Sequence, residues 1–167
     1  MESPGDPLIR EQRPGDGPGL ARVWLDNARY YVERFPRDFR IPDEDGLAEF
    51  FDTPVPGPDA VTFVAEVDGD VVAFAYVRMS YPDEHARFQY LAPYAEPRAH
   101  VDALGTADAY QGRGLATMLV ERCEAWARER GARQIGTATY LESELSIPFW
   151  ERRMGFRRKG VNLVKQL

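Results

Sequence analysis

The most informative stretch of the sequence reads Ala107-Asp108-Ala109-Tyr110-Gln111-Gly112-Arg113-Gly114-Leu115-Ala116. It lies between a predicted strand that ends at Thr106 and a strongly periodic predicted helix that begins near Leu115. Gly112 and Gly114 allow the backbone to approach a ligand closely, and the N–H groups of residues 113–116 converge at the positive end of the helix. The stretch therefore predicts a binding site for a phosphate or a pyrophosphate.

Three phosphate-binding motifs place glycines at such a turn. A P-loop requires a Gly-Lys-Ser/Thr ending that is absent, and the dinucleotide fingerprint requires a third glycine where Thr117 stands. The remaining pattern, Gln/Arg-x-x-Gly-x-Gly/Ala, is satisfied by Gln111, Gly114 and Ala116. A purely structural strand-to-helix turn stays open as an alternative.

This remaining pattern resembles the pyrophosphate loop of the GCN5-related N-acetyltransferase (GNAT) family. The Leu-x-Thr ending of the preceding strand and Tyr110 before Gln111 are also similar to the family's motif. So is a second segment, Ser143-Glu144-Leu145-Ser146-Ile147-Pro148-Phe149-Trp150 followed by Gly155-Phe156, which resembles the part that closes the coenzyme A site. The order of predicted elements fits the family over nearly the whole chain, and residues 100–156 carry the motifs.

The resemblance implies an α/β fold with a mixed, mostly antiparallel central sheet flanked by helices, in which a splayed strand pair admits acetyl-coenzyme A. It implies direct transfer of the acetyl group to a primary amine of an unidentified small molecule or peptide. The cofactor-binding residues that it implies are Leu104, Gly105, Thr106, Gln111, Gly112, Arg113, Gly114, Leu115, Ala116, Ser143, Ser146, Phe149 and Trp150. A non-catalytic acetyl-coenzyme A binding or sensor module is the alternative, and a nucleotide-phosphate binder that shares only the loop is a third hypothesis.

A general base or a water chain has to take the proton of the amine, because only a neutral amine attacks. His100 and Asp102 are the candidate catalytic residues. They would point to one side of a regular strand, close to where many family members carry a glutamate. The two side chains could equally pair with each other or with the loop of residues 80–98.

The family commonly has a tyrosine in the last helix that protonates the leaving thiolate. Aligning Phe149-Trp150 with the usual Phe-Tyr puts Trp150 at this position, and indole cannot supply the proton. Counting back from Gly155 puts Glu151 there instead, and Tyr140 or solvent remain as donors. Phe149 and Trp150 also suit a core role in which they pack the helix on the sheet.

Apolar periodicity and turn residues predict the other elements. Strands are expected at 7–12, 61–67, 70–79, 100–106 and 134–139, with a terminal strand pair at 156–158 and 161–165; helices are expected at 18–33, 44–51, 115–130 and 143–153. Asp16 is a candidate cap of the first helix, and Asp68-Gly69 suits a primed turn between two strands. Residues 80–98 should form a long irregular connection whose aromatic side chains fold onto a surface.

The length of 167 residues and the formal net charge of -6 limit the function classes. The length indicates a single domain over residues 1–167. The negative charge argues against nucleic acid as a partner and suits a small cationic or aromatic amine, to which the tyrosines and acids of residues 20–55 and 80–98 also point. A homodimer is left open.

Cysteine and histidine are too few for a metal site, so no metal is predicted. Cys123 is the only cysteine, which excludes an internal disulfide, and it lies on the apolar stripe of the predicted helix as a buried thiol. The first residues lack the pattern of a secretory signal, and no apolar stretch is long enough to span a bilayer. We therefore expect a cytoplasmic protein without a membrane partner.

Overall fold

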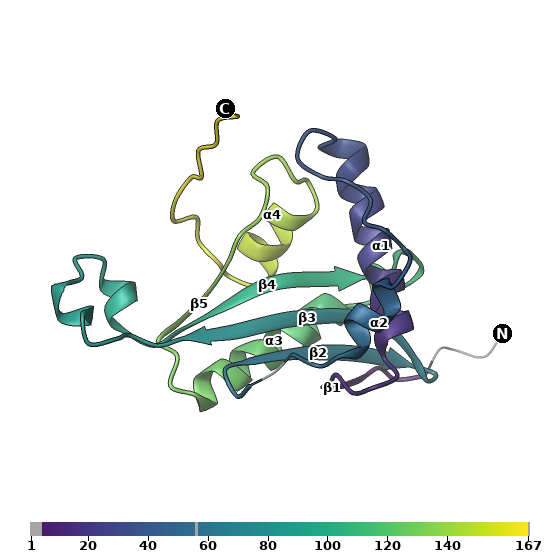
Figure 1. Cartoon of the computed structure of the whole chain (residues 1–167), viewed down its shortest axis with the longest axis horizontal. Helices are drawn as coiled ribbons and strands as arrows, with labels where there is room; N and C mark the ends of the chain where they lie inside the picture. Colours follow the sequence, from purple (N-terminus) through teal and green to yellow (C-terminus); the bar gives the residue numbers. More distant parts are fainter. Residues whose placement is uncertain (1–4, 56, 167) are drawn as a thin grey trace. The chain divides into compact units, whose positions relative to one another are not determined.

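A five-stranded mixed sheet organises the chain up to Thr137 (Figure 1). The computed structural model describes residues 5–55 and 57–166. The strands are β1 Leu8–Glu11, β2 Ala60–Val67, β3 Asp70–Ser80, β4 Arg98–Thr106 and β5 Gln134–Thr137, and they lie side by side in this order. The first four pair antiparallel, whereas β4 and β5 are parallel. The predicted mixed, mostly antiparallel sheet is thus confirmed.

The hairpin of β2 and β3 forms as the sequence predicts. Asp68 and Gly69 both have positive φ, 51° and 89°. This is the conformation of a primed two-residue turn, whose twist matches that of the strands it joins. Both strands are apolar and mostly buried, which places the hairpin at the centre of the sheet.

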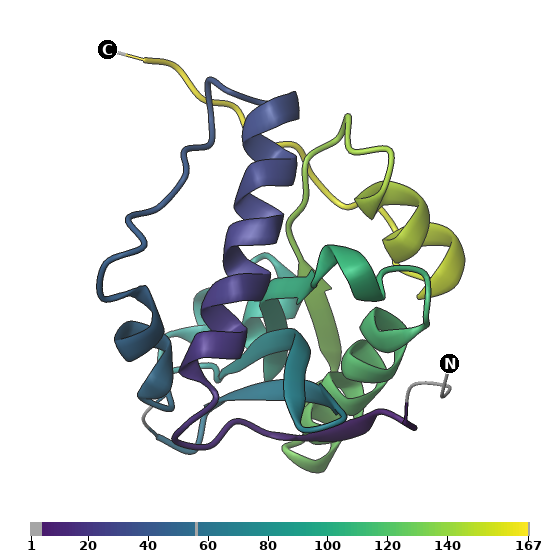
Figure 2. The ribbon, with the colours of Figure 1, turned by 90° about the vertical axis from the view of Figure 1, so that its right-hand side faces the viewer.

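Helices cover both faces of the sheet (Figure 2). They are α1 Gly17–Arg34, α2 Leu47–Asp52 and α3 Leu115–Glu129. Neighbouring strand residues point to opposite faces. Val64 accordingly belongs to a buried cluster with Leu20 and Val23 of α1, while the ring of Phe63 lies 4.5 Å below the guanidinium of Arg122 on α3. The buried thiol of Cys123 is on α3, as expected.

The start of α1 differs from the prediction, because Asp16 makes no side-chain cap. Its carboxylate instead receives two hydrogen bonds from Arg10 at 2.7 Å, and Arg10 also pairs with Glu66 of β2 at 2.6 Å. Asp52, at the end of α2, accepts hydrogen bonds from the N–H groups of Gly15 and Gly17 instead. An ion pair with Arg10 of β1 therefore took the carboxylate that the sequence offers as a cap.

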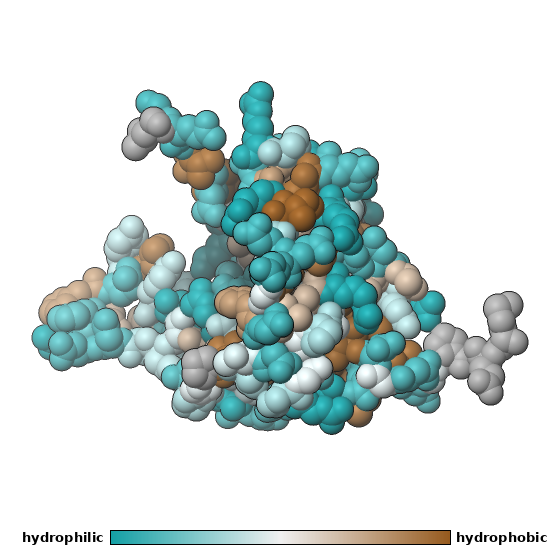
Figure 3. Space-filling view, turned by 45° about the vertical axis from the view of Figure 1, so that its right-hand side comes forward, coloured by the Kyte–Doolittle hydropathy of each residue, from teal (hydrophilic) through white to brown (hydrophobic). Residues whose placement is uncertain are grey.

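The connection between β3 and β4 is long and irregular, as predicted, with two short 3₁₀ turns at Ala86–Phe88 and Ala92–Ala95. The expectation that its aromatic side chains fold onto a surface is wrong. Phe88 is 71% exposed and Tyr90 is 91% exposed. Elsewhere the face in Figure 3 is mostly hydrophilic, with apolar side chains in scattered groups.

The chain divides into two compact units, one up to Thr137 and one from Ala138 onward. The second unit contains a short helix, α4 Ser146–Pro148, which continues as a π-helical turn over Phe149–Arg153. The predicted terminal strand pair is wrong: residues 154–166 contain no strand. Their apolar side chains Val161, Leu163 and Val164 are exposed, so the segment has no buried face to stabilise a strand. A single domain stays a prediction.

No helix within residues 5–55 and 57–166 is both long and apolar enough to cross a membrane.

Candidate functional site

β4 separates from β5 halfway along its length. The two strands pair from Arg98 with Gln134 to Val101 with Thr137. β4 then continues to Thr106 and pairs only with β3. Residues 102–106 therefore have an edge that β5 does not cover, which is the splayed strand pair that the sequence analysis expects.

The open edge of β4 presents backbone groups of Leu104 and Thr106. The carbonyl of Leu104 accepts a hydrogen bond from Nδ2 of Asn27 on α1 at 3.1 Å, and Ala107 N–H donates to Val72 of β3 at 2.8 Å. Backbone groups of an antiparallel strand alternate in direction from one residue to the next. The N–H groups of Leu104 and Thr106 thus point away from β3, toward the side that β5 does not cover.

Gly105 lies between these two residues and packs against α1. A β-carbon there would come within 3.0 Å of a Val23 methyl and 3.2 Å of the Phe74 ring, and would collide with the Asn27 amide. The glycine is therefore explained by the close approach of α1 to β4. This contact also fixes the Asn27 amide at the Leu104 carbonyl.

The glycine-rich loop leads directly from this edge into α3. Gly112 and Gly114 have φ values of 75° and 81°, a left-handed conformation that glycine adopts without strain. The first intrahelical hydrogen bond runs from Met118 N–H to Gly114 O at 3.1 Å. The N–H groups before Met118 therefore lie at the positive end of the helix, as a site for a diphosphate requires.

Side chains of the loop hold its shape. Gln111 donates to the carboxylate of Asp108 at 3.0 Å, and Arg113 donates to the carbonyl of Ala109 at 3.1 Å. The Arg113 guanidinium also lies 4.8 Å from the centre of the Tyr110 ring. The side chains of Gln111 and Arg113, two of the predicted cofactor-binding residues, are thus folded back on the exposed loop.

β4 is irregular at Asp102, where the sequence analysis assumes a regular strand. Tyr76 of β3 faces Ala103, but the next residue, Val77, faces Val101. Asp102 is therefore the extra residue of a β-bulge and has no partner in the ladder. A bulge turns the side chain of its extra residue out of the regular alternation.

Asp102 binds Arg78 of β3 through both carboxylate oxygens. Arg78 Nε donates to Oδ2 at 2.5 Å and Nη2 to Oδ1 at 3.2 Å. The imidazole of His100 is farther away, with Nε2 at 3.7 Å from Asp102 Oδ1. The two candidate catalytic residues are thus neighbours, but Asp102 is paired with a residue that the sequence analysis did not single out.

The pKa of His100 lies below its usual 6.5, and partial burial of the imidazole is the largest cause. The negative charge of Asp102 raises this pKa, and the positive charge of Arg78 lowers it. The side chain is 34% exposed. His100 is consequently neutral at physiological pH, and solvent or a ligand can reach it. A neutral imidazole in this state can accept a proton.

The predicted residues Ser143, Ser146, Phe149 and Trp150 belong to the second unit, in which they make local contacts. Ser146 N–H donates to Ser143 Oγ at 3.1 Å, and the ring centres of Phe149 and Trp150 are 5.1 Å apart. The Trp150 ring also packs on Phe156 at 4.9 Å. Within this unit the serines shape the start of α4, and the aromatic residues form a small cluster.

Glu151, the other candidate for the general acid, forms an ion pair with Arg158. Arg158 Nε lies 2.5 Å from Glu151 Oε1. The hydrogen bond from Arg158 is the largest cause of the lowered pKa of Glu151. A carboxyl group stabilised as the anion is a poor proton donor at neutral pH.

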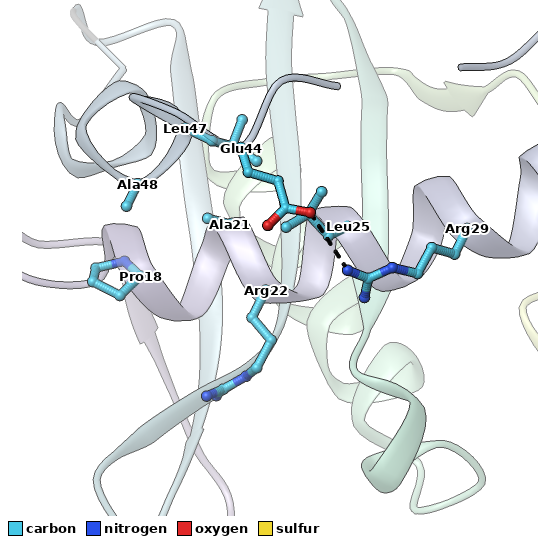
Figure 4. Close-up of a pocket in the computed structure, with 8 residues that line it drawn as sticks. All are labelled: Pro18, Ala21, Arg22, Leu25, Arg29, Glu44, Leu47 and Ala48. Carbon is cyan, nitrogen blue, oxygen red and sulfur yellow. Dashed lines mark ion pairs between the residues drawn. The ribbon is translucent and has the colours of Figure 1, made fainter. Parts of the chain in front are cut away.

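A cavity of about 330 Å³ lies apart from these residues, between α1 and α2 (Figure 4). Ala21 and Leu25 of α1 and Leu47 of α2 contribute apolar surface, and Arg29 approaches Glu44 across it at 3.8 Å.

Among the residues that the structure describes, no group of three or more His, Cys, Asp or Glu side chains could hold a metal ion. The site geometry therefore rests on β4 and the glycine-rich loop.

Two residues of the site, Arg78 and Asn27, were not predicted from the sequence. Each left a signal, because Arg78 is the only charged residue between Val71 and Met79 of an otherwise apolar strand, and Asn27 is a polar residue on the packed stripe of α1. Neither signal names a partner. The partners, Asp102 and Leu104, are known only once the strands are in register.

Comparisons with known proteins identify the family of the chain. A model of the acetyltransferase (GNAT) family matches residues 21–156. The uncharacterized N-acetyltransferase YdgE of Bacillus subtilis (strain 168) is 27% identical over 90 residues, which are 51% of this chain. The match spans 57% of the length of that relative.

Solved structures share the fold over almost the whole chain. A mutant of the BH1408 protein from Bacillus halodurans has a TM-score of 0.80 at 16% identity and covers 96% of this chain and 99% of its own. The aminoglycoside N-acetyltransferase AAC(6')-Iy in complex with CoA has a TM-score of 0.67 at 14% identity, and covers 99% and 97%. With a family model that matches most of its length, the chain belongs to the GNAT acetyltransferase family.

Proposed function

We propose that the chain is an N-acetyltransferase that moves the acetyl group of acetyl-CoA directly to a primary amine of a small molecule or peptide. One observation carries the proposal. β4 leaves β5 after Val101, and its open edge leads without interruption into the glycine-rich loop at the start of α3. A strand edge that β5 does not cover is thus followed along the chain by a candidate anion site. A ligand with a diphosphate and an extended arm would need both, the loop for the diphosphate and the strand edge for the arm.

The residues of this edge and loop fit acetyl-CoA. The N–H groups of residues 113–116 would hold the diphosphate, and those of Leu104 and Thr106 would donate to the pantetheine or to the acetyl carbonyl. Gln111 and Gly112 would keep the loop in shape. Acetyl-CoA supplies the acetyl group as a thioester, and the protein would position the amine beside it.

His100 would accept the proton of the amine. Its low pKa keeps the imidazole neutral, and its position on β4, before the strands part, places it beside the open edge. Asp102 would assist only indirectly, because Arg78 holds its carboxylate. The leaving thiolate would take its proton from solvent, since Glu151 is held as the anion and Trp150 has no proton to give.

A small cationic or aromatic amine is the acceptor that we propose. The net charge of -6 favours a cationic partner, and CoA-bound AAC(6')-Iy is an aminoglycoside N-acetyltransferase of the same fold. A cytoplasmic location and a homodimer stay predictions.

Thiol release from acetyl-CoA tests this function. The protein is incubated with acetyl-CoA and a panel that contains an aminoglycoside, a polyamine, an arylalkylamine and a lysine peptide, and free thiol is followed by a disulfide reagent. We expect release that depends on one class of amine and on His100. Binding of acetyl-CoA without release from any class would contradict the transferase.

A non-catalytic acetyl-CoA binding module is the second candidate, and the Arg78–Asp102 pair favours it. The pair removes one of the two candidate bases from proton transfer. Turnover by the wild-type protein separates the two functions, and in a transferase His100→Gln should abolish this turnover without changing the affinity for acetyl-CoA.

A further inference from the structure

Arg78 binds one candidate base, Asp102, and acts electrostatically on the other, His100. It lies directly opposite His100 in the register of β3 and β4. Its guanidinium is turned to Asp102, with which it forms two hydrogen bonds, and its third nitrogen, Nη1, lies 3.5 Å from the hydroxyl of Ser80. The guanidinium therefore reaches Asp102 on one side and, on the other, Ser80, whose register partner is Arg98 at the start of β4.

The pairing decides how Asp102 acts on His100. A free carboxylate 3.7 Å from an imidazole would favour its protonated form and make it a poor base at neutral pH. In the bidentate pair, the positive guanidinium offsets part of this effect: Asp102 raises the pKa of His100, and Arg78 lowers it. The bulge at Asp102 turns the carboxylate so that this pair can form.

Few other charges surround the imidazole. On β4 the neighbour is Asp102, and on β3 it is Arg78, next to which Tyr76 lies as a titratable group. On the β5 side the register partner is Gly136, which has no side chain; a β-carbon there would lie 3.5 Å from His100 Nδ1. Burial therefore has the largest effect on the pKa of His100, and Arg78 offsets part of the opposing effect of Asp102.

We infer that Arg78 is a positioning residue of the acetyltransfer site: it binds Asp102 in a bidentate ion pair and thereby leaves His100 as the single neutral base for the amine. The inference rests on the proposed function. In the reaction, one proton passes from the amine nitrogen to the imidazole and later to solvent, and neither Asp102 nor Arg78 exchanges a proton.

NMR titration of the two histidines tests the electrostatic part without any turnover. The chain contains only His85 and His100, so each imidazole can be followed in the intact protein, and the exposed His85 serves as the internal reference. Arg78→Gln removes the charge. Arg78→Lys keeps it but cannot form the bidentate pair.

We expect the titration midpoint of His100 to rise by about 1 pH unit in Arg78→Gln and by less in Arg78→Lys, with His85 unmoved. Adding Asp102→Asn to Arg78→Gln should cancel the rise, because no carboxylate is then left beside the imidazole. If the Arg78→Gln protein is folded and the titration midpoint of His100 is unchanged, the inference is overturned. Arg78 is 46% exposed, so its replacement should not unfold the sheet.

The pH profile of turnover tests the catalytic part. The acidic limb of kcat should move upward in Arg78→Gln by the shift that NMR measures, while KM for acetyl-CoA stays the same. An active wild-type enzyme whose acidic limb does not follow the midpoint of His100 contradicts the role of Arg78. A wild-type protein without turnover on any amine refutes the proposed function instead, and the two failures are thus distinguished.

Discussion

A negative charge placed in the glycine-rich loop should remove CoA binding without unfolding the protein. Gly114 precedes α3 with a φ of 81°, and nothing lies within 4 Å of the place where a β-carbon would be added. Gly114→Glu therefore meets no neighbour, and its left-handed backbone costs about 1–2 kcal/mol of stability. At about 5 Å from a phosphate charge, the carboxylate would repel it by about 1–3 kcal/mol at effective dielectric constants of 80 to 20.

This repulsion corresponds to a loss of affinity of about fivefold to 140-fold, since 1.4 kcal/mol is about a factor of ten. Isothermal titration with CoA measures it. Gly131→Glu is the matched control, because Gly131 follows the other end of α3 with a φ of 78° and equally open space. The helix dipole tolerates a glutamate better at the start than at the end, so instability cannot explain a loss confined to Gly114→Glu. Unchanged affinity in Gly114→Glu would refute the loop assignment.

Three further predictions concern stability and reactivity. Gly105→Ala should cost about 1–3 kcal/mol of stability through overpacking against α1 and lower the melting temperature by roughly 3–9 °C. In the control Gly136→Ala, the added β-carbon makes an ordinary contact, so the melting temperature should change little. Equal melting temperatures of the two variants would contradict the packing at Gly105. Arg10→Ala should destabilise the protein by about 3 kcal/mol in chemical denaturation, because it leaves the buried carboxylate of Asp16 unpaired, and a loss near zero would show that the pair contributes nothing. Burial raises the pKa of the Cys123 thiol to about 12. The native protein should therefore not react with a disulfide reagent at pH 7 to 8, and one thiol should react after denaturation. Rapid reaction of the native protein would disprove this burial.

Local signals in the sequence were enough for much of the fold and for the glycine-rich loop. The hairpin at Asp68-Gly69 and the turn at Gly112 and Gly114 depend on backbone conformations that few other residues adopt, and both are found. The periodicity of α3 places its helix correctly to within one residue at its end. Such features are set by neighbouring residues, so they can be read without knowing the rest of the fold.

The remaining features depend on partners that are distant in the sequence. Asp102 binds Arg78, 24 residues away, only because a bulge changes the register of β4 on β3. Asp16 was expected to cap a helix, but Arg10 takes its carboxylate, and the same guanidinium also binds Glu66 of β2, which is 56 residues from Arg10. The terminal strand pair failed because alternation predicts a strand only where one face is buried, and Val161 is exposed.

Backbone amide shifts during a titration with CoA test the central claim most directly. We predict that the amides of residues 112–116 shift first and most, together with those of Leu104 and Thr106 at the open edge of β4, while Gly131 at the far end of α3 does not move. Shifts that gather instead around the cavity between α1 and α2, with the loop amides unchanged, would contradict it.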